Sequence, residues 1–194
     1  MINKHAFILF FLAVSAKFFA QDPTFTQFYS NPVYMNPALA GSSGCPRVAL
    51  NYRNEWPQLT GNYITYAAAY DSYFKNISGG VGLVAMHDMQ GQGTIQTSMI
   101  GASYSYYLKV NRKFRLMFGT QAAYYQKFLD WSKLTFGDMI DPRRGFIYQT
   151  GDVPRGNGRR GFFDVSAGLV GFSKNFYFGA AFHHLNRPDE SLIL

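Results

Sequence analysis

The histidines of this chain are the first candidates for metal binding or acid–base chemistry, and two of them are adjacent, at His183 and His184. The sequence around them predicts a strand over 175–186, and successive side chains of a strand point to opposite faces. Two imidazoles on opposite faces cannot readily share one metal ion, so the pair is interpreted as wall residues of a sheet near an interface. The same alternation separates His87 from Asp88. We therefore expect no metal site and no cofactor.

Catalysis would need a nucleophile with a base placed to activate it. The sequence contains no GxSxG, HExxH or paired CxxC motif. Ser103, Ser105 and Ser166 fall on polar strand faces, but the sequence places no histidine to serve them. The single cysteine, Cys45, cannot form an internal disulfide and is expected to be a small buried residue or a bystander. The sequence therefore predicts no catalytic residues and no enzyme activity.

The polar segment 137–161 is the candidate for binding a partner. Its charged residues are Asp138, Asp141, Asp152, Arg143, Arg144, Arg155, Arg159 and Arg160. One interpretation is a solvated loop with surface ion pairs that each contribute little. The other is a recognition surface for a secreted protein or for lipid A phosphates, because the arginine fork suits carboxylates and phosphates. On the second interpretation the binding residues are Arg143, Arg144, Asp152, Arg155, Arg159 and Arg160.

The elements that must position these residues are strands of period two. Residues 113–127 place on one face Phe114, Leu116, Phe118, Ala122 and Tyr124. The other face carries Arg115, Gly119, Gln121, Ala123, Tyr125 and Lys127. An apolar face opposite a polar, small-residue face is typical of a sheet between lipid and water. The same pattern predicts seven strands, over 47–55, 62–75, 80–89, 94–109, 113–128, 161–172 and 175–186.

The connections between the predicted strands follow the same architecture. The second, fourth and sixth are short, polar and contain Asn and Lys, at 75–79, 110–113 and 173–175, whereas the fifth, 129–160, is the longest. Barrels of the outer membrane alternate short periplasmic turns with longer outer loops. The sequence therefore predicts an all-β, transmembrane antiparallel outer-membrane β-barrel. Because such bacterial barrels have even strand numbers of eight or more, we expect about seven strands to be the N-terminal half of a larger barrel.

Composition agrees with a membrane barrel. Aromatic residues make up 18% of the chain and charged residues 15%, against about 25% charged in soluble domains. A soluble all-β sandwich is the alternative, but the polar second face argues against a dry sandwich core. The formal net charge of +7 suits anionic lipid or an acidic partner. Nucleic acid is not expected as a partner, because the basic residues are scattered over turns and loops.

The N-terminus predicts export. Residues 1–20 combine a short positive region with an apolar stretch that is too short to span a bilayer, which is typical of a signal peptide. Cleavage after Ala16 and cleavage after Ala20 both remain open. An exported chain of this composition is expected in the outer membrane.

Residues 21–47 are expected to form an irregular leader on the periplasmic side, followed by a partial barrel over 48–194. The leader contains four prolines, which forbid a regular helix or a central strand: Pro23, Pro32, Pro37 and Pro46. It also contains aromatic and apolar residues with surface to bury. We expect an ordered segment that packs against or inside the barrel, the alternative being a flexible leader.

Three segments resemble the PorP/SprF family. QDPTFTQFYSNPVYMNPALAG at 21–41 resembles the family's mature N-terminus, NYRNEWP at 51–57 resembles its first-strand signature, and FFDVSAGLVGFSKNFYFGAAFHHLNRP at 162–188 resembles its central strand pair. The resemblance implies an outer-membrane protein of the type IX secretion system of Bacteroidetes, associated with secretion of surface adhesins and gliding motility. Its implied partners are a secreted surface protein or other secretion-system components, together with outer-membrane lipid. Members of the family are generally longer, so this chain departs from them by stopping early.

The expected function is that of a non-enzymatic barrel for secretion or surface anchoring of adhesin-like proteins. The alternatives are a porin-like small-solute channel and, less in keeping with the residues above, a barrel enzyme acting on lipids. The sequence leaves open the client protein, the state of any pore and the oligomeric state.

Overall fold

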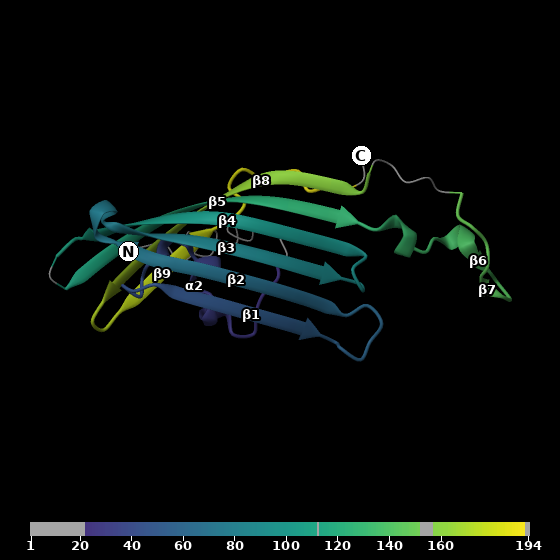
Figure 1. The fold of residues 1–194 in the computed structure, drawn as a ribbon, viewed down its shortest axis with the longest axis horizontal. Helices are drawn as coiled ribbons and strands as arrows, with labels where there is room; N and C mark the ends of the chain where they lie inside the picture. The colour runs from purple at the N-terminus through teal and green to yellow at the C-terminus, as the bar shows by residue number, and fades with distance from the viewer. Residues whose placement is uncertain (1–21, 112, 152–156, 193–194) are drawn as a thin grey trace, which may run out of the picture.

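The computed structural model describes residues 22–111, 113–151 and 157–192. These residues form one curled seven-stranded antiparallel sheet and one small two-stranded sheet. The strands of the large sheet are β1 (Arg47–Glu55), β2 (Tyr63–Phe74), β3 (Gly79–Gln90), β4 (Ile95–Lys109), β5 (Phe114–Leu129), β8 (Arg159–Ser173) and β9 (Tyr177–Phe182). They lie side by side in that order (Figure 1). The half-barrel expected from the sequence is confirmed.

The strand boundaries agree with the predicted ones to within two residues, except at the end of the last strand. β9 ends at Phe182 instead of continuing to residue 186. The backbone turns away from the sheet after Phe182, and His184 adopts a positive φ of 56°, which is incompatible with a regular strand. The prediction that His183 and His184 point to opposite faces of a strand is therefore wrong, since neither lies in a regular strand.

The outer face of the sheet is apolar and the inner face is polar or small, as predicted. On β4 and β5 the outward residues include Ile100, Phe118 and Tyr124, which are 63%, 47% and 41% exposed. Their neighbours Gly119 and Gln121 face inward and are buried. Exposed apolar side chains on one face of a sheet are what a lipid environment favours.

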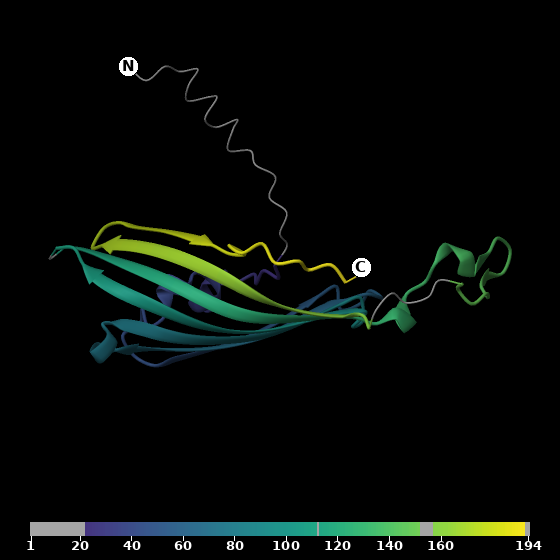
Figure 2. The same cartoon turned by 90° about the horizontal axis from the view of Figure 1, so that it is seen from above.

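The leader lies inside the curl of the sheet. Figure 2 shows it between the two sides of the curved sheet. It contains three short helical turns, which are η1 (Phe28–Ser30), α2 (Pro32–Met35) and η2 (Pro37–Leu39). The leader is thus an ordered segment packed on the inner face, and the alternative of a flexible leader does not describe residues 22–46.

An apolar cluster joins the leader to the sheet. Val33 and Ala40 of the leader are completely buried, and they pack in one cluster with Val84, Met86 and Tyr125 of the sheet. A second cluster joins the leader's Ala38 to Met117 and Val170. The inner face is therefore mixed: it contains buried polar side chains and an apolar strip on which the leader packs. Burial of this strip stabilises the attachment of the leader through the hydrophobic effect.

The two ends of the sheet differ. At one end, here the short-turn end, the strands are joined by the connections 75–78, 110–113 and 174–176, the first of which contains η3 (Lys75–Ile77). At the other, the long-loop end, the connections are 56–62, 91–94 and 130–158. The last contains η4 (Trp131–Lys133), η5 (Gly137–Met139) and the distal hairpin, which is β6 (Ile140–Asp141) paired with β7 (Gly145–Phe146). Within the described ranges, no helix is long and apolar enough to cross a membrane.

Candidate functional site

The segment 137–161 is folded in part and divides its arginines between two places. The distal hairpin projects past the strand ends (Figure 1) and carries Arg143 and Arg144, which are exposed. Arg159 and Arg160 are instead the first two residues of β8. Asp152 and Arg155 lie outside the described residues. The structure therefore does not bring the predicted binding residues together in one described cluster.

The charged groups of this segment make few ion pairs with one another. The carboxylate of Asp141 accepts hydrogen bonds from the backbone amides of Arg143 and Arg144, within the turn of the hairpin, and Asp138 accepts from the amide of Gly151. Arg160 pairs with Asp189 at 2.7 Å, and the Arg159 guanidinium lies 5.3 Å from the ring centroid of Phe128. No ion pair of the described residues includes the two arginines of the hairpin.

The leader contacts the sheet at glycines that occupy inward positions of their strands. We call these glycines the glycine seat. A Cβ atom at Gly80 would lie 2.1 Å from the carbonyl oxygen of Ala40, and one at Gly168 would lie 1.9 Å from Oδ1 of Asn36. At Gly119 it would lie 2.1 Å from the amide nitrogen of Ala38. At Gly80 and Gly119 contacts this short would force the backbone of the leader to move, and at Gly168 they would displace the side chain of Asn36. These three positions, on β3, β8 and β5, therefore admit the leader only as glycine.

Two Asn-Pro pairs shape the leader. Asn31 and Asn36 each precede a proline at the first helical position, and each side chain accepts a hydrogen bond from a backbone amide of its own turn. Asn36 also reaches the sheet, because its Nδ2 donates to the carbonyl oxygens of Leu169 and Ala180, on β8 and β9. One side chain therefore caps a turn and fastens it to the last two strands.

The C-terminal part of the leader is held by charge-assisted hydrogen bonds. The buried carboxylate of Asp71, on β2, accepts from the amide of Gly41 at 2.7 Å and from Nε of Arg47 at 2.8 Å. The carbonyl oxygen of Ala40 accepts from the hydroxyls of Ser105 and Tyr107 on β4, at 2.6 Å and 2.8 Å. Hydrogen bonds to ionised groups are among the stronger ones in proteins.

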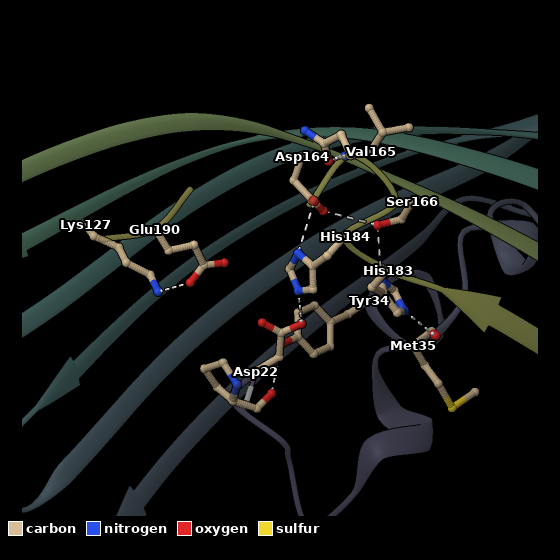
Figure 3. Close-up of polar contacts among 12 residues, drawn as sticks. Asp22, Tyr34, Met35, Lys127, Asp164, Val165, Ser166, His183, His184 and Glu190 are labelled. Atoms are coloured by element: carbon tan, nitrogen blue, oxygen red, sulfur yellow. Dashed lines mark hydrogen bonds and ion pairs between the residues drawn. The ribbon is translucent and has the colours of Figure 1, made fainter. Parts of the chain in front are cut away.

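The N-terminal part of the leader is fastened through His184, as Figure 3 shows. The Nδ1 atom of His184 lies 3.0 Å from Oδ1 of Asp164, and its Nε2 lies 2.9 Å from Oδ2 of Asp22. Carboxylates only accept hydrogen bonds, so both ring nitrogens must donate and the imidazole is positively charged. His184 therefore links Asp22 of the leader to Asp164 of β8, with the Lys127–Glu190 ion pair nearby (Figure 3).

The electrostatics of this link agree with its geometry. The hydrogen bond to Asp22 raises the pKa of His184 to about 9, against a smaller opposing effect of burial. Burial alone would raise the pKa of Asp22, but the hydrogen bond and positive charge of His184 outweigh it and lower that pKa. Both residues lie outside the strands. The link is thus an ion pair over the ordinary range of pH.

The same cluster contains a serine beside a second histidine. The hydroxyl of Ser166 lies 3.3 Å from Oδ2 of Asp164 and 3.2 Å from Nδ1 of His183. Nε2 of His183 lies 3.4 Å from the carbonyl oxygen of Met35, which only accepts, so Nε2 donates, and in the neutral imidazole Nδ1 is an acceptor. The sequence placed no histidine to serve Ser166, whereas the structure brings His183 beside it. Ser166 is buried. Across the described ranges, no group of three or more His, Cys, Asp and Glu side chains is placed to hold a metal ion.

What the site does is hold a segment in place, and a comparison with known families agrees with an assembly role. The family model of the type IX secretion system membrane protein PorP/SprF matches residues 17–193. The chain belongs to the PorP/SprF family. It is therefore a membrane component of a type IX secretion system. Neither a curated protein nor a solved structure matches the chain.

Sequence reasoning missed two functional features of this PorP/SprF chain. The Asp22–His184–Asp164 link joins residues that are 162 positions apart, and no spacing signal announces it. The glycine seat did have a signal, because Gly80, Gly119 and Gly168 share the inward parity of their strands. Cys45 is exposed, so of the two predictions for this residue the bystander is the one that describes it.

Proposed function

We propose that this PorP/SprF chain is a non-enzymatic scaffold of the outer membrane that serves secretion or surface anchoring of adhesin-like proteins, and through them gliding motility. The observation that carries the proposal is the attachment of the leader to the inner face. Hydrogen bonds from β2, β4, β8 and β9 hold it, and glycines on three strands admit its backbone. An inner face occupied in this way by the protein's own leader suits a support for other proteins better than a pore for solutes.

The distal hairpin supports a recognition role for the long-loop end. Next to Arg143 and Arg144 it exposes Phe146, Ile147 and Tyr148, at 61%, 49% and 53%. Aromatic and arginine side chains together are the composition that dominates the energetics of protein interfaces. The proposed binding surface is therefore the hairpin with its two arginines, extended by Asp152, Arg155, Arg159 and Arg160.

The test is a charge reversal in cells that carry the full-length protein. Arg143→Glu combined with Arg144→Glu should lower the amount of surface adhesin and the gliding speed, without changing the amount of the protein in the outer-membrane fraction. Lys113→Glu combined with Lys174→Glu makes the same change of charge at the short-turn end and is the matched control. Normal surface adhesin in the hairpin variant would contradict the recognition role.

The scaffold and channel alternatives are separated by conductance. The purified protein in planar bilayers should show no steady ion conductance, because the leader is packed on the inner face of the sheet. A variant that lacks residues 22–40 provides the positive control, since removal of the leader uncovers the polar inner face. Steady conductance of the intact protein would favour the porin-like function.

A further inference from the structure

A cavity of about 890 Å³ opens on the inner face at the short-turn end, beyond the leader. Its base is apolar, formed by Leu39 of the leader with Met117 and Val170 of the sheet. Its wall contains Lys109, Arg115, Phe172 and Tyr177. We name this space the mouth cavity. Its volume is within the range of about 300–1,000 Å³ that binding pockets occupy.

The four wall residues form one row across four strands. Lys109 of β4 is the register partner of Arg115 of β5, which is also the partner of Phe172 of β8. Phe172 is in turn the partner of Tyr177 of β9. Directly opposite residues of antiparallel strands share a face. Two cations are therefore followed by two aromatic rings along a single row of the inner face.

The two cations of the row are placed against each other without compensation. Like charges at directly opposite positions destabilise a sheet. Among the residues that the structure describes, no acidic side chain pairs with Lys109 or Arg115, and the nearby carboxylate of Asp71 is already bound by Arg47 and Gly41. An anion between the two cations would remove this repulsion.

The aromatic half of the row offers a second kind of contact. The Arg115 guanidinium lies 5.9 Å from the ring centroid of Phe172, which joins the basic part of the row to the aromatic part. The next ring, that of Tyr177, is 83% exposed although it is on the inner face. The row therefore presents a place for a carboxylate directly beside a place for an apolar side chain.

We propose that the mouth cavity binds an acidic polypeptide segment of a partner protein, with a carboxylate between Lys109 and Arg115 and a neighbouring apolar side chain on Phe172 and Tyr177. A polypeptide fits better than a lipid because the row is on the inner face. The next residues, Leu108 and Leu116, point outward, and the outward face is the one that lipid contacts.

This inference rests on the proposed scaffold role only for the source of the partner, which is another component of the secretion system. The mouth cavity lies at the opposite end of the strands from the distal hairpin. Loss of hairpin function and loss of peptide binding are therefore separate results, and either can fail while the other holds.

The experiment measures binding of a fluorescein-labelled peptide of alternating glutamate and phenylalanine to the purified full-length protein by fluorescence anisotropy. The peptide should bind, and Lys109→Gln combined with Arg115→Gln should raise its Kd about tenfold or more, because two charge-assisted contacts are lost. Lys75→Gln combined with Lys174→Gln makes the same change of charge on turns outside the cavity and should leave the Kd within about twofold. Heat-modified electrophoresis confirms that both variants remain folded.

Two further measurements can overturn the proposal. A peptide with glutamine in place of glutamate must bind more weakly, so equal binding would exclude a carboxylate site. Vesicles of phosphatidylglycerol must not displace the peptide. If they do so, and the Lys109 and Arg115 variant no longer binds the vesicles, the cavity is a lipid site and not a polypeptide site.

Discussion

Gly119 of β5 and Ala38 of the leader are in contact through their backbones, because a Cβ atom at position 119 would lie 2.1 Å from the amide nitrogen of Ala38. Gly119 lies on an inward position of β5, the fifth of the seven strands in the sheet order. There is therefore no room for even one added carbon atom between the strand and the leader at this position. This contact makes the attachment of the leader testable by the smallest substitution available.

Gly119→Ala should displace the leader and lower the free energy of unfolding by about 1–3 kcal/mol, the usual cost of adding a group to a filled space. The readout is the thiol labelling rate of Ala38→Cys in a Cys45→Ser background, because position 38 is fully buried and Cys45 is the only cysteine. Labelling should become faster in the Gly119→Ala variant. Gly137→Ala, at a position with no atom within 4 Å of the new Cβ, is the control, and equal labelling in both variants would refute the seat.

The sheet itself could be predicted from the sequence because its signal is local. Alternation of apolar with polar or small residues along 94–109 and 113–128 marks both the strands and their faces, and these faces are the observed ones. Short Asn- and Lys-containing connections mark the hairpins in the same way. The first strand, 47–55, has the predicted bounds.

The attachments of the leader could not be predicted in the same way, because they join residues that are distant in sequence. The Asn36 amide meets carbonyl oxygens of β8 and β9, more than 130 positions away. The end of β9 was misplaced for a related reason. His184 lies outside the strand, where it contacts Asp22 and Asp164. A tertiary contact of this kind produces no periodic pattern in the local sequence. The Asn-Pro pairs of the leader do indicate helix starts, because asparagine caps a helix and proline suits its first position. The prediction of an irregular leader considered only that prolines disrupt helices and strands.

A charge introduced on the outward face should destabilise the protein by an amount that depends on its depth in the membrane. Ile100 lies near the middle of the membrane-facing part of β4, and Leu108 lies on the same face of the same strand near its end. Ile100→Arg should cost about 2–4 kcal/mol in lipid, whereas Leu108→Arg should cost about 0–1 kcal/mol. The measurement is the free energy of unfolding by denaturant in lipid vesicles. Equal costs at the two positions would mean that this face does not cross a bilayer.

The final prediction concerns pH and the link between Asp22 and Asp164 through His184. The pKa of His184 is raised from 6.5 to about 9 in the folded chain. A raised pKa means that the folded state binds the proton more tightly, so the link contributes its full stability below pH 6.5 and loses it as the pH rises through about 9. The melting temperature should therefore fall, and proteolysis of the leader should become faster, between these two values.

His184→Gln removes the titrating group and should make both quantities nearly independent of pH in that window, with a lower melting temperature at pH 6.5 and below. The matched control is His87→Gln, because His87 points outward and contacts Ser98 instead of the leader. This variant should keep the pH dependence of the unmodified protein. If the His184→Gln protein shows the same decline between pH 6.5 and 9 as the unmodified protein, another group titrates and the ion pair does not hold the leader. Since the leader covers part of the inner face, the same substitution should also raise conductance in planar bilayers as the leader loosens.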